Sequence, residues 1–107
     1  MGSQVIGYGQ VVAKVIVAKV RASYMIKVLF FAHLSEVAGA HSLDLAFTKQ
    51  KSVDAVIDDL KMHAPAPLID ELKKQTAMVS INQSYATWQS MVNDDDELAF
   101  LPPVSGG

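Results

Sequence analysis

The hydrophobic and polar positions of residues 25–60 predict two strands followed by a helix. Met25–Phe31 is a nearly continuous apolar run, rich in β-branched and aromatic residues, which is typical of an interior strand. In His41–Phe47 apolar residues alternate with polar or small ones, which indicates a strand with one buried face. After Ser52, a suitable N-cap, apolar residues recur at the spacing of one helix face: Val53, Val56, Ile57 and Leu60.

Shorter elements fill the rest of the chain. One helical turn over residues 35–38 is expected to stop at Gly39, and Leu68–Gln75 is a second short helix. Met78–Asn82 and Glu97–Leu101 read as strands, and residues 93–96 read as a turn of solvated acids. We expect Trp88 and Met91 to fill the core.

The order of these elements predicts an α+β fold. Strands that surround one main helix indicate a mixed β-sheet covered on one face by that helix. The ubiquitin-like β-grasp is the obvious candidate for this arrangement.

The first 24 residues differ from the rest in composition. They contain Lys14, Lys19 and Arg21 but no acid, and these lysines interrupt their apolar stretch, unlike the pattern of a signal peptide. We interpret residues 1–24 as an accessory extension or leader, with the domain at 25–107. The alternative is an additional strand or helix that packs on the domain.

Charge and composition narrow the classes of partner. Residues 25–107 contain six lysines and eleven acids and so carry a charge of −5, which argues against nucleic acid and for a basic partner surface. The 107 residues form one small domain, without cysteine and without an apolar run long enough to cross a membrane. We therefore expect a cytoplasmic protein that binds neither nucleic acid nor a membrane.

No internal catalytic or metal site is predicted. The three histidines are far apart in the sequence, and the acids at 94–97 lack the spacing and the glycine of a calcium loop. No serine has an evident base partner. We expect no metal and no bound cofactor.

The chemistry is therefore expected at the C-terminal tail: Pro102, Pro103, Val104, Ser105, Gly106 and Gly107. The prolines stop the last strand and stiffen the tail, whereas the glycines have no Cβ and fit a narrow channel. A carboxylate is a poor electrophile, so the Gly107 carboxyl group would have to be activated by another enzyme that uses ATP. The activated carbonyl could then accept sulfur, or be transferred to a thiol and an amine.

Three segments resemble the small subunit of molybdopterin synthase, the sulfur carrier of molybdenum cofactor biosynthesis. They are Met25–Ala32, Val79–Gln83 and Asp95–Gly107, and the likeness spans about residues 25–107. The acidic turn, the apolar strand and the Pro-Pro-Val-Ser-Gly-Gly ending form its most specific part.

This resemblance implies a β-grasp whose Gly107 is adenylated by a ubiquitin-activating-type adenylyltransferase and then converted to a thiocarboxylate. The tail would enter the large subunit of molybdopterin synthase and donate sulfur to cyclic pyranopterin monophosphate. Catalytic lysines would lie on the large subunit, in a heterotetramer, so this chain would be a sulfur-donor subunit without an active site of its own. A sheet patch near Phe30, Phe100 or Leu101 is expected to contact the large subunit.

Two features depart from the family pattern: Ser35, where many relatives have arginine, and the N-terminal extension. Two alternatives remain open. One is a thiamin-type sulfur carrier, against which the Pro-Pro pair argues. The other is a ubiquitin-like modifier or a plain β-grasp interaction module.

Overall fold

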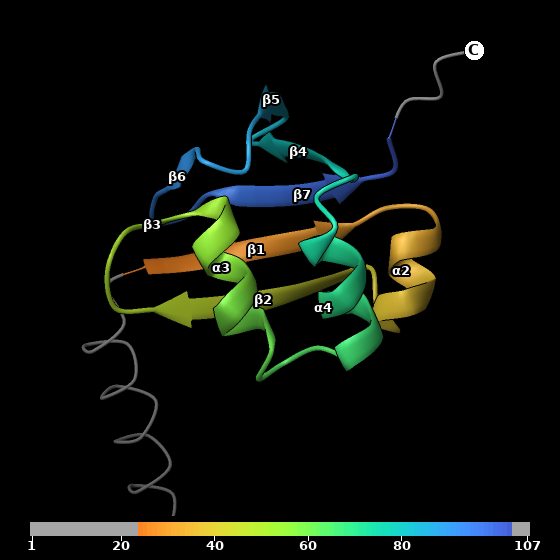
Figure 1. Cartoon of the computed structure of the whole chain (residues 1–107). Coiled ribbons are helices and arrows are strands. Elements are labelled where there is room, and N and C mark those ends of the chain that lie inside the picture. The colour runs from red at the N-terminus through yellow and green to blue at the C-terminus, as the bar shows by residue number, and fades with distance from the viewer. Residues whose placement is uncertain (1–23, 104–107) are drawn as a thin grey trace, which may run out of the picture.

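A computed structural model describes residues 24–103, and its centre is a five-stranded mixed sheet (Figure 1). The strand order is β2-β1-β7-β4-β5. β1 is parallel to β7, and the other neighbouring pairs are antiparallel. The bounds are β1 Tyr24–Phe30, β2 Ser42–Phe47, β4 Met78–Ile81, β5 Ser84–Ala86 and β7 Glu97–Leu101.

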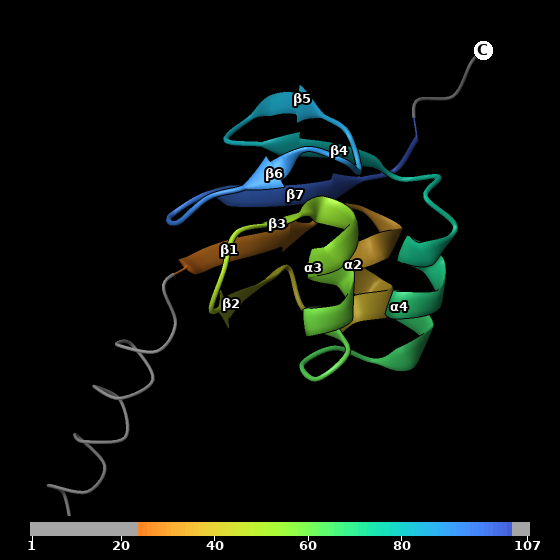
Figure 2. The ribbon, with the colours of Figure 1, turned by 60° about the vertical axis from the view of Figure 1, so that its left-hand side comes forward.

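Three helices lie on one side of this sheet, as Figure 2 shows from the side. They are α2 (His33–Ala38), α3 (Val53–Leu60) and α4 (Ala66–Lys73). A second, small sheet pairs β3 (Lys51–Ser52) with β6 (Met91–Val92). Among the described residues, no element covers the opposite face of the large sheet. The prediction of an α+β fold with a mixed sheet under one main helix is confirmed, although α2 and α4 share the covering role.

The predicted helix signals are confirmed in detail. The Ser52 hydroxyl oxygen accepts a hydrogen bond from the Ala55 N–H at 3.2 Å, and all four apolar residues of the predicted stripe are buried. Gly39 ends α2 in the left-handed conformation, with φ of 74°. α4 begins at Ala66, two residues before the predicted start, because the extended Pro65 is its N-cap and Pro67 lies in its first turn.

Residues 82–92 were predicted least well. Asn82 and Gln83 both have positive φ, 52° and 69°, and so form a tight turn that pairs β4 with β5, a strand that the sequence pattern did not predict. Trp88 is buried as expected and stacks on Phe100. The expectation for Met91 was wrong, because it is 48% exposed on the short strand β6.

The core is organised around Phe100 in the middle strand. Its ring is fully buried, with centroids 6.2 Å from Phe30 and 5.6 Å from Trp88. Val28 and Leu98 lie beside it, fully buried and opposite each other in the parallel pair. The helices cover this layer of side chains.

The acidic turn is not wholly solvated, because Asp96 is buried. Its two carboxylate oxygens accept hydrogen bonds from the Asn82 side-chain amide (2.8 Å) and the Asn93 N–H (2.7 Å). The Asn82 side-chain oxygen in turn accepts from the Glu97 N–H at 2.9 Å. Asp96 therefore joins the β4–β5 turn to the start of β7, a role that residue composition alone does not reveal.

Asp96→Ala should lower the free energy of unfolding by about 2 kcal/mol, because it leaves the Asn82 amide and the Asn93 N–H without their acceptor. Urea unfolding monitored by the fluorescence of the buried Trp88 measures this loss. Asp70→Ala is the control, since Asp70 is exposed on α4, and it should change stability by less than about 0.5 kcal/mol. Equal losses in the two variants would contradict the structural role of Asp96.

Candidate functional site: the tail exit and the open sheet face

The chain leaves the domain through a strand that is paired on both sides. β7 is hydrogen-bonded to β1 on one side and to β4 on the other. At its end, the Phe31 N–H donates to the Phe100 carbonyl oxygen at 3.2 Å, and Leu101 is still paired with Met78. The start of the tail is therefore fixed relative to the whole sheet.

Pro102 and Pro103 follow directly and end the pairing. Pro102 is half-buried and Pro103 is exposed. Neither has an N–H for a neighbouring strand, and each has a restricted φ. The remaining tail residues of the sequence prediction, Val104, Ser105, Gly106 and Gly107, lie outside the described residues, as does the N-terminal segment up to residue 23.

The sheet face opposite the helices carries rows of apolar side chains that lead toward the tail. In register, Leu29 is paired with Ala99, and Ala99 with Ser80. The next row toward the tail contains Leu101 and Met78, with Phe31 directly after β1. We call Leu29, Phe31, Tyr85, Ala99 and Leu101 the open face.

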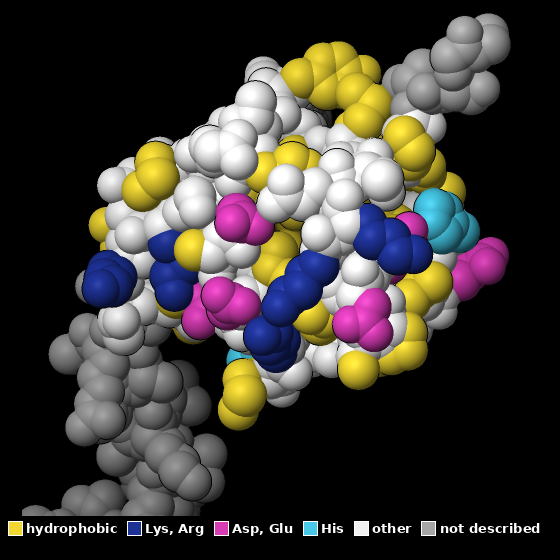
Figure 3. Space-filling model, viewed as in Figure 1, with side chains coloured by type: hydrophobic (Ala, Val, Ile, Leu, Met, Phe, Trp, Pro, Cys, Tyr) yellow, Lys and Arg dark blue, Asp and Glu magenta, His cyan; other side chains and the backbone are white. Residues whose placement is uncertain are grey.

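The open face exposes large hydrophobic side chains around a shallow hollow. Phe31 is 45% exposed and Tyr85, paired with Ser80, is 77% exposed. The hollow has a volume of about 550 Å³, and all five open-face residues line it. Figure 3, seen from the helix side, shows that charged side chains of both signs cover the helices. Exposed aromatic side chains around a hollow make the open face a candidate interaction site.

Two of the three residues of the predicted contact patch lie in the core. Phe30 and Phe100 are 2% and 0% exposed and belong to the core, so they cannot contact a partner directly. Leu101 lies on the open face and is half-buried. Because side chains alternate along a strand, Phe31 and Ala99 take the outward positions next to those two phenylalanines. The strand register was the missing information, and the exposed Phe31 and Tyr85 were not among the predicted residues.

Charged residues border the open face at the end far from the tail. Lys27 of β1 lies opposite Asp44 of β2 and Glu97 of β7 in the register. These three residues, together with Asp95 and Asp96, line a separate hollow. Charged residues therefore border the open face at one end, and the start of the tail borders it at the other.

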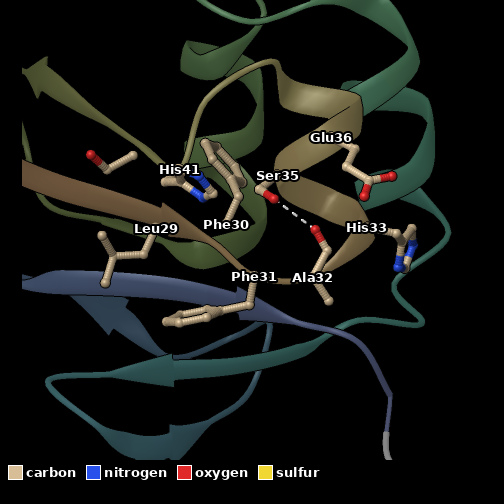
Figure 4. Close-up of a pocket in the computed structure, with 9 residues that line it drawn as sticks. Leu29, Phe30, Phe31, Ala32, His33, Ser35, Glu36 and His41 are labelled. Carbon is tan, nitrogen blue, oxygen red and sulfur yellow. Dashed lines mark hydrogen bonds between the residues drawn. The ribbon is translucent and has the colours of Figure 1, made fainter.

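A second hollow lies beside α2, next to the tail exit (Figure 4). It has a volume of about 800 Å³. Leu29 and Phe31 line it from the sheet, as they line the hollow on the open face. We call it the α2 hollow, and its other lining residues are Phe30, Ala32, His33, Ser35, Glu36, His41 and Ser42.

The turn between β1 and α2 holds Ala32 in a backbone conformation that alanine rarely adopts. Its φ is 53° and its ψ is −133°, close to the first central position of a type II′ turn, where glycine is usual. The Leu34 N–H closes the turn on the Phe31 carbonyl oxygen at 3.1 Å. The Ser35 hydroxyl donates to the Ala32 carbonyl oxygen at 2.7 Å. These bonds hold the turn that presents Phe31 on the open face.

Two kinds of feature, a metal-binding cluster and a membrane-spanning helix, are absent from residues 24–103. In this range, no group of three or more histidines and acids is placed to bind a metal ion. No helix in the same range is long and apolar enough to span a membrane.

The family model described as the ThiS family matches residues 28–107, which include the end of β1, the other strands of the sheet and the tail. The chain belongs to the ThiS family. It is 33% identical to the molybdopterin synthase sulfur carrier subunit of Arabidopsis thaliana over 86 residues, which cover 80% of this chain and 86% of that protein. It is 35% identical to the subunit of the same name from Haemophilus influenzae, over 78% of this chain and all of that protein. The resemblance found in the sequence is confirmed.

Solved structures agree with the fold of this ThiS family member. SAMP1 from Haloferax volcanii has a TM-score of 0.59 and 26% identity, over 78% of this chain and 99% of that chain. A chain in the complex of subunits 1 and 2 of molybdopterin-converting factor from Helicobacter pylori has a TM-score of 0.53 and 20% identity, over 78% of this chain and 99% of that chain. The β-grasp assignment is thereby confirmed.

Ala32→Gly should stabilise this ThiS family member by about 1 kcal/mol. Glycine relieves backbone strain of about 1–3 kcal/mol and adds roughly 0.5–1 kcal/mol of backbone entropy to the unfolded state. The matched control is Ala55→Gly inside α3, which should destabilise by about 1 kcal/mol. Thermal unfolding measures both variants, and a destabilised Ala32→Gly would show that the turn is not strained.

Proposed function

We propose that the chain is the sulfur carrier subunit of molybdopterin synthase, in molybdenum cofactor biosynthesis. One observation supports this function above all others. The central strand of the sheet, β7, leads directly into the Pro-Pro-Val-Ser-Gly-Gly segment beside an exposed apolar face. Relatives that bear this name are covered along 86% and 100% of their length. The chain is a sulfur donor within a sulfurtransferase complex and supplies no active site of its own.

In the proposed reaction, Gly107 carries the reacting atoms. Its carboxylate attacks the α-phosphate of ATP on an adenylyltransferase, and pyrophosphate leaves. A sulfur nucleophile then attacks the acyl carbon and displaces AMP, which leaves a thiocarboxylate on Gly107. The thiocarboxylate sulfur then bonds to cyclic pyranopterin monophosphate in the synthase, and water hydrolyses the acyl–sulfur bond, which leaves the sulfur on the pterin and restores the Gly107 carboxylate. The absence of cysteine from the sequence fits this route, because the carrier has no thiol that competes for the sulfur.

The tail acts in this proposal as a stiff arm. The segment Pro102–Gly107 spans about 20 Å when extended, enough to reach a site inside another protein. Pro102 and Pro103 restrict the arm before it binds, so less conformational entropy is lost on insertion. Val104, Ser105 and Gly106 would lie in the channel of the large subunit, where glycine admits the closest approach.

The open face is the proposed contact with the large subunit. The tail alone is a thin anchor, whereas Phe31 and Tyr85 are exposed aromatic side chains of the kind that dominates interface energies. Both lie on the sheet through which the tail leaves. A structural neighbour was solved as a complex of subunits 1 and 2 of molybdopterin-converting factor. That precedent supports a second subunit as the partner here. We propose a ubiquitin-activating-type adenylyltransferase as a further partner and the cytoplasm, where ATP is available, as the location.

A second candidate function is a ubiquitin-like protein modifier. It is favoured by the similarity to SAMP1, because that name stands for small archaeal modifier protein 1. A modifier would use the same activated Gly107 but join it to amines of other proteins. Isopeptide-linked adducts in cells would support this candidate, and a thiocarboxylate without adducts would support the sulfur carrier.

Incubation of the full chain with the adenylyltransferase, ATP and a sulfur source should raise the intact mass by the exchange of one oxygen for sulfur. Deletion of Gly107 should abolish this change while altering the free energy of unfolding by less than about 0.5 kcal/mol, because the last residue lies beyond β7. Intact-mass spectrometry and urea unfolding provide the two readouts. Sulfur found on an internal residue would contradict the proposal.

Phe31→Ser and Tyr85→Ser should each weaken binding to the large subunit about tenfold or more, because each removes an aromatic contact from the open face. Met62→Ser is the matched control, since Met62 is 82% exposed just beyond α3, away from the open face, and its loss should leave the affinity unchanged. Titration calorimetry measures all three. If the control weakens binding as much as the other two, the interface lies elsewhere.

A further inference from the structure

The open face lies on the side of the sheet away from the three helices, and no element of residues 24–103 covers it (Figure 2). Along β1, side chains on this side alternate with core residues, so Met25 and Lys27 precede Leu29 and Phe31 in one row. Met25 and Phe31, at the two ends of the row, are both exposed. The row is about 20 Å long at the usual rise of a strand.

The end of this row where the chain enters the sheet is acidic. Met25 donates its N–H to the Asp94 carboxylate at 2.8 Å, and its carbonyl oxygen accepts from the Asp95 N–H at 2.9 Å. The hollow beside Met25 has a volume of about 370 Å³, and its charged lining residues are Lys27, Asp44, Asp95, Asp96 and Glu97. Even with the buried, hydrogen-bonded Asp96 set aside, acids outnumber the single lysine.

The sequence that precedes β1 has a composition complementary to this surface. Residues 11–20 comprise eight apolar residues and two lysines, and Arg21 follows them. Residues 1–23 contain three basic residues and no acid, whereas residues 25–107, with six lysines and eleven acids, carry a charge of −5. An apolar segment with basic residues near β1 therefore precedes an apolar face whose acids lie at the start of β1.

The connection to β1 is short and suits a contact within the chain. Residues 21–23 span about 10 Å when extended, which is the distance at which a second layer packs on a sheet. Residues 11–20 span about 15 Å as a helix and about 33 Å as a strand, so in either conformation they reach from Met25 to Leu29. A segment tethered so closely has a high effective concentration at the surface.

We propose that residues 11–20 pack on the open face of their own chain, with Lys19 and Arg21 beside the acids at the start of β1. The segment then competes with the large subunit, which must displace it to reach Phe31 and Tyr85. The contact within the chain is independent of the proposed function, whereas the competition rests on that function.

Paramagnetic NMR of the full chain tests the contact without any partner. The sequence has no cysteine, so Lys14→Cys places a single nitroxide label in the segment. The amide signals of Leu29 and Phe31 should lose intensity, because the label lies over their face of the sheet. Those of Asp58 and Asp70, exposed on the helix side, should keep theirs. Equal losses on both sides, or no loss at Leu29 and Phe31, would overturn the contact.

Second substitutions in the labelled chain test the chemistry of the contact. Ile16→Asp should restore the signals, because it puts a charge into an apolar interface. Gln10→Asp is the matched control, since it adds the same charge just outside the segment, and it should leave the losses unchanged. Lys19→Glu together with Arg21→Glu should also restore the signals at low salt, because like charges then face the acids. Losses that persist in Ile16→Asp, or that vanish equally in Gln10→Asp, would refute the apolar contact, and losses that persist in the double variant would refute the basic one.

A mixture of two samples distinguishes a contact within one chain from a contact between copies. Chain with the nitroxide but without ¹⁵N is mixed with ¹⁵N-labelled chain that has no nitroxide. The signals of Leu29 and Phe31 should keep their intensity in this mixture. A loss there would show that a second copy occupies the open face and would overturn the proposal.

Titration calorimetry with the large subunit measures the competition. Ile16→Asp should bind about threefold more tightly than the parent or better, because a covered face lowers the apparent affinity by the fraction of chains that are uncovered. Gln10→Asp should bind like the parent. Equal affinities of Ile16→Asp and the parent would overturn the competition. A parent chain that gains no sulfur and does not bind the large subunit would overturn the proposed function and the competition, but not a contact established by NMR.

Discussion

The pairing of β7 between β1 and β4 is the constraint on which the core, the open face and the tail all depend. A strand held on both sides cannot shift its register without disturbing two neighbours, and a shift by one residue would exchange its two faces. Phe100 would then leave the core, and Ala99 and Leu101 would leave the open face. The position of the tail is thus determined by the same hydrogen bonds that determine the core.

The alternation of side chains along β1 and β7 gives each strand two roles. Val28, Leu98 and Phe100 point to the helices and supply the stability of a small domain. Leu29 and Leu101 point the other way and line the hollow of the open face, which is the proposed recognition surface. The strained conformation of Ala32 is part of this arrangement, because the turn must bring the chain from β1 to α2 immediately after Phe31. The residues that stabilise the domain and those proposed to bind a partner therefore lie on opposite faces of the same two strands.

The sequence predicted the long, strongly patterned elements correctly, and the physical reasons are local. A helix with an N-cap at Ser52 and a β-branched run at Met25–Phe31 carry their own signals. The turn at residues 82–84 was predicted from its residue types, but strand β5 after it was not, because Asn82 and Gln83 lack the glycine that usually marks a two-residue hairpin. The same holds for Asp96, whose burial depends on a contact with residue 82. Strand β5 and the burial of Asp96 both depend on pairings that the residue types at these positions do not reveal.

Only part of the candidate site could be predicted from the sequence. The tail is a feature of the sequence alone, so Pro102–Gly107 could be identified without a structure. The choice among Phe30, Phe31, Phe100 and Leu101 needed the strand register, since all four are apolar and adjacent. The α2 hollow could not be predicted from the sequence, because it combines residues of β1, α2 and β2 with the unusual backbone conformation of Ala32. A carrier whose reactive group is a common peptide terminus must obtain its specificity from surfaces of this kind, since the terminus itself offers little to distinguish one Gly-Gly protein from another.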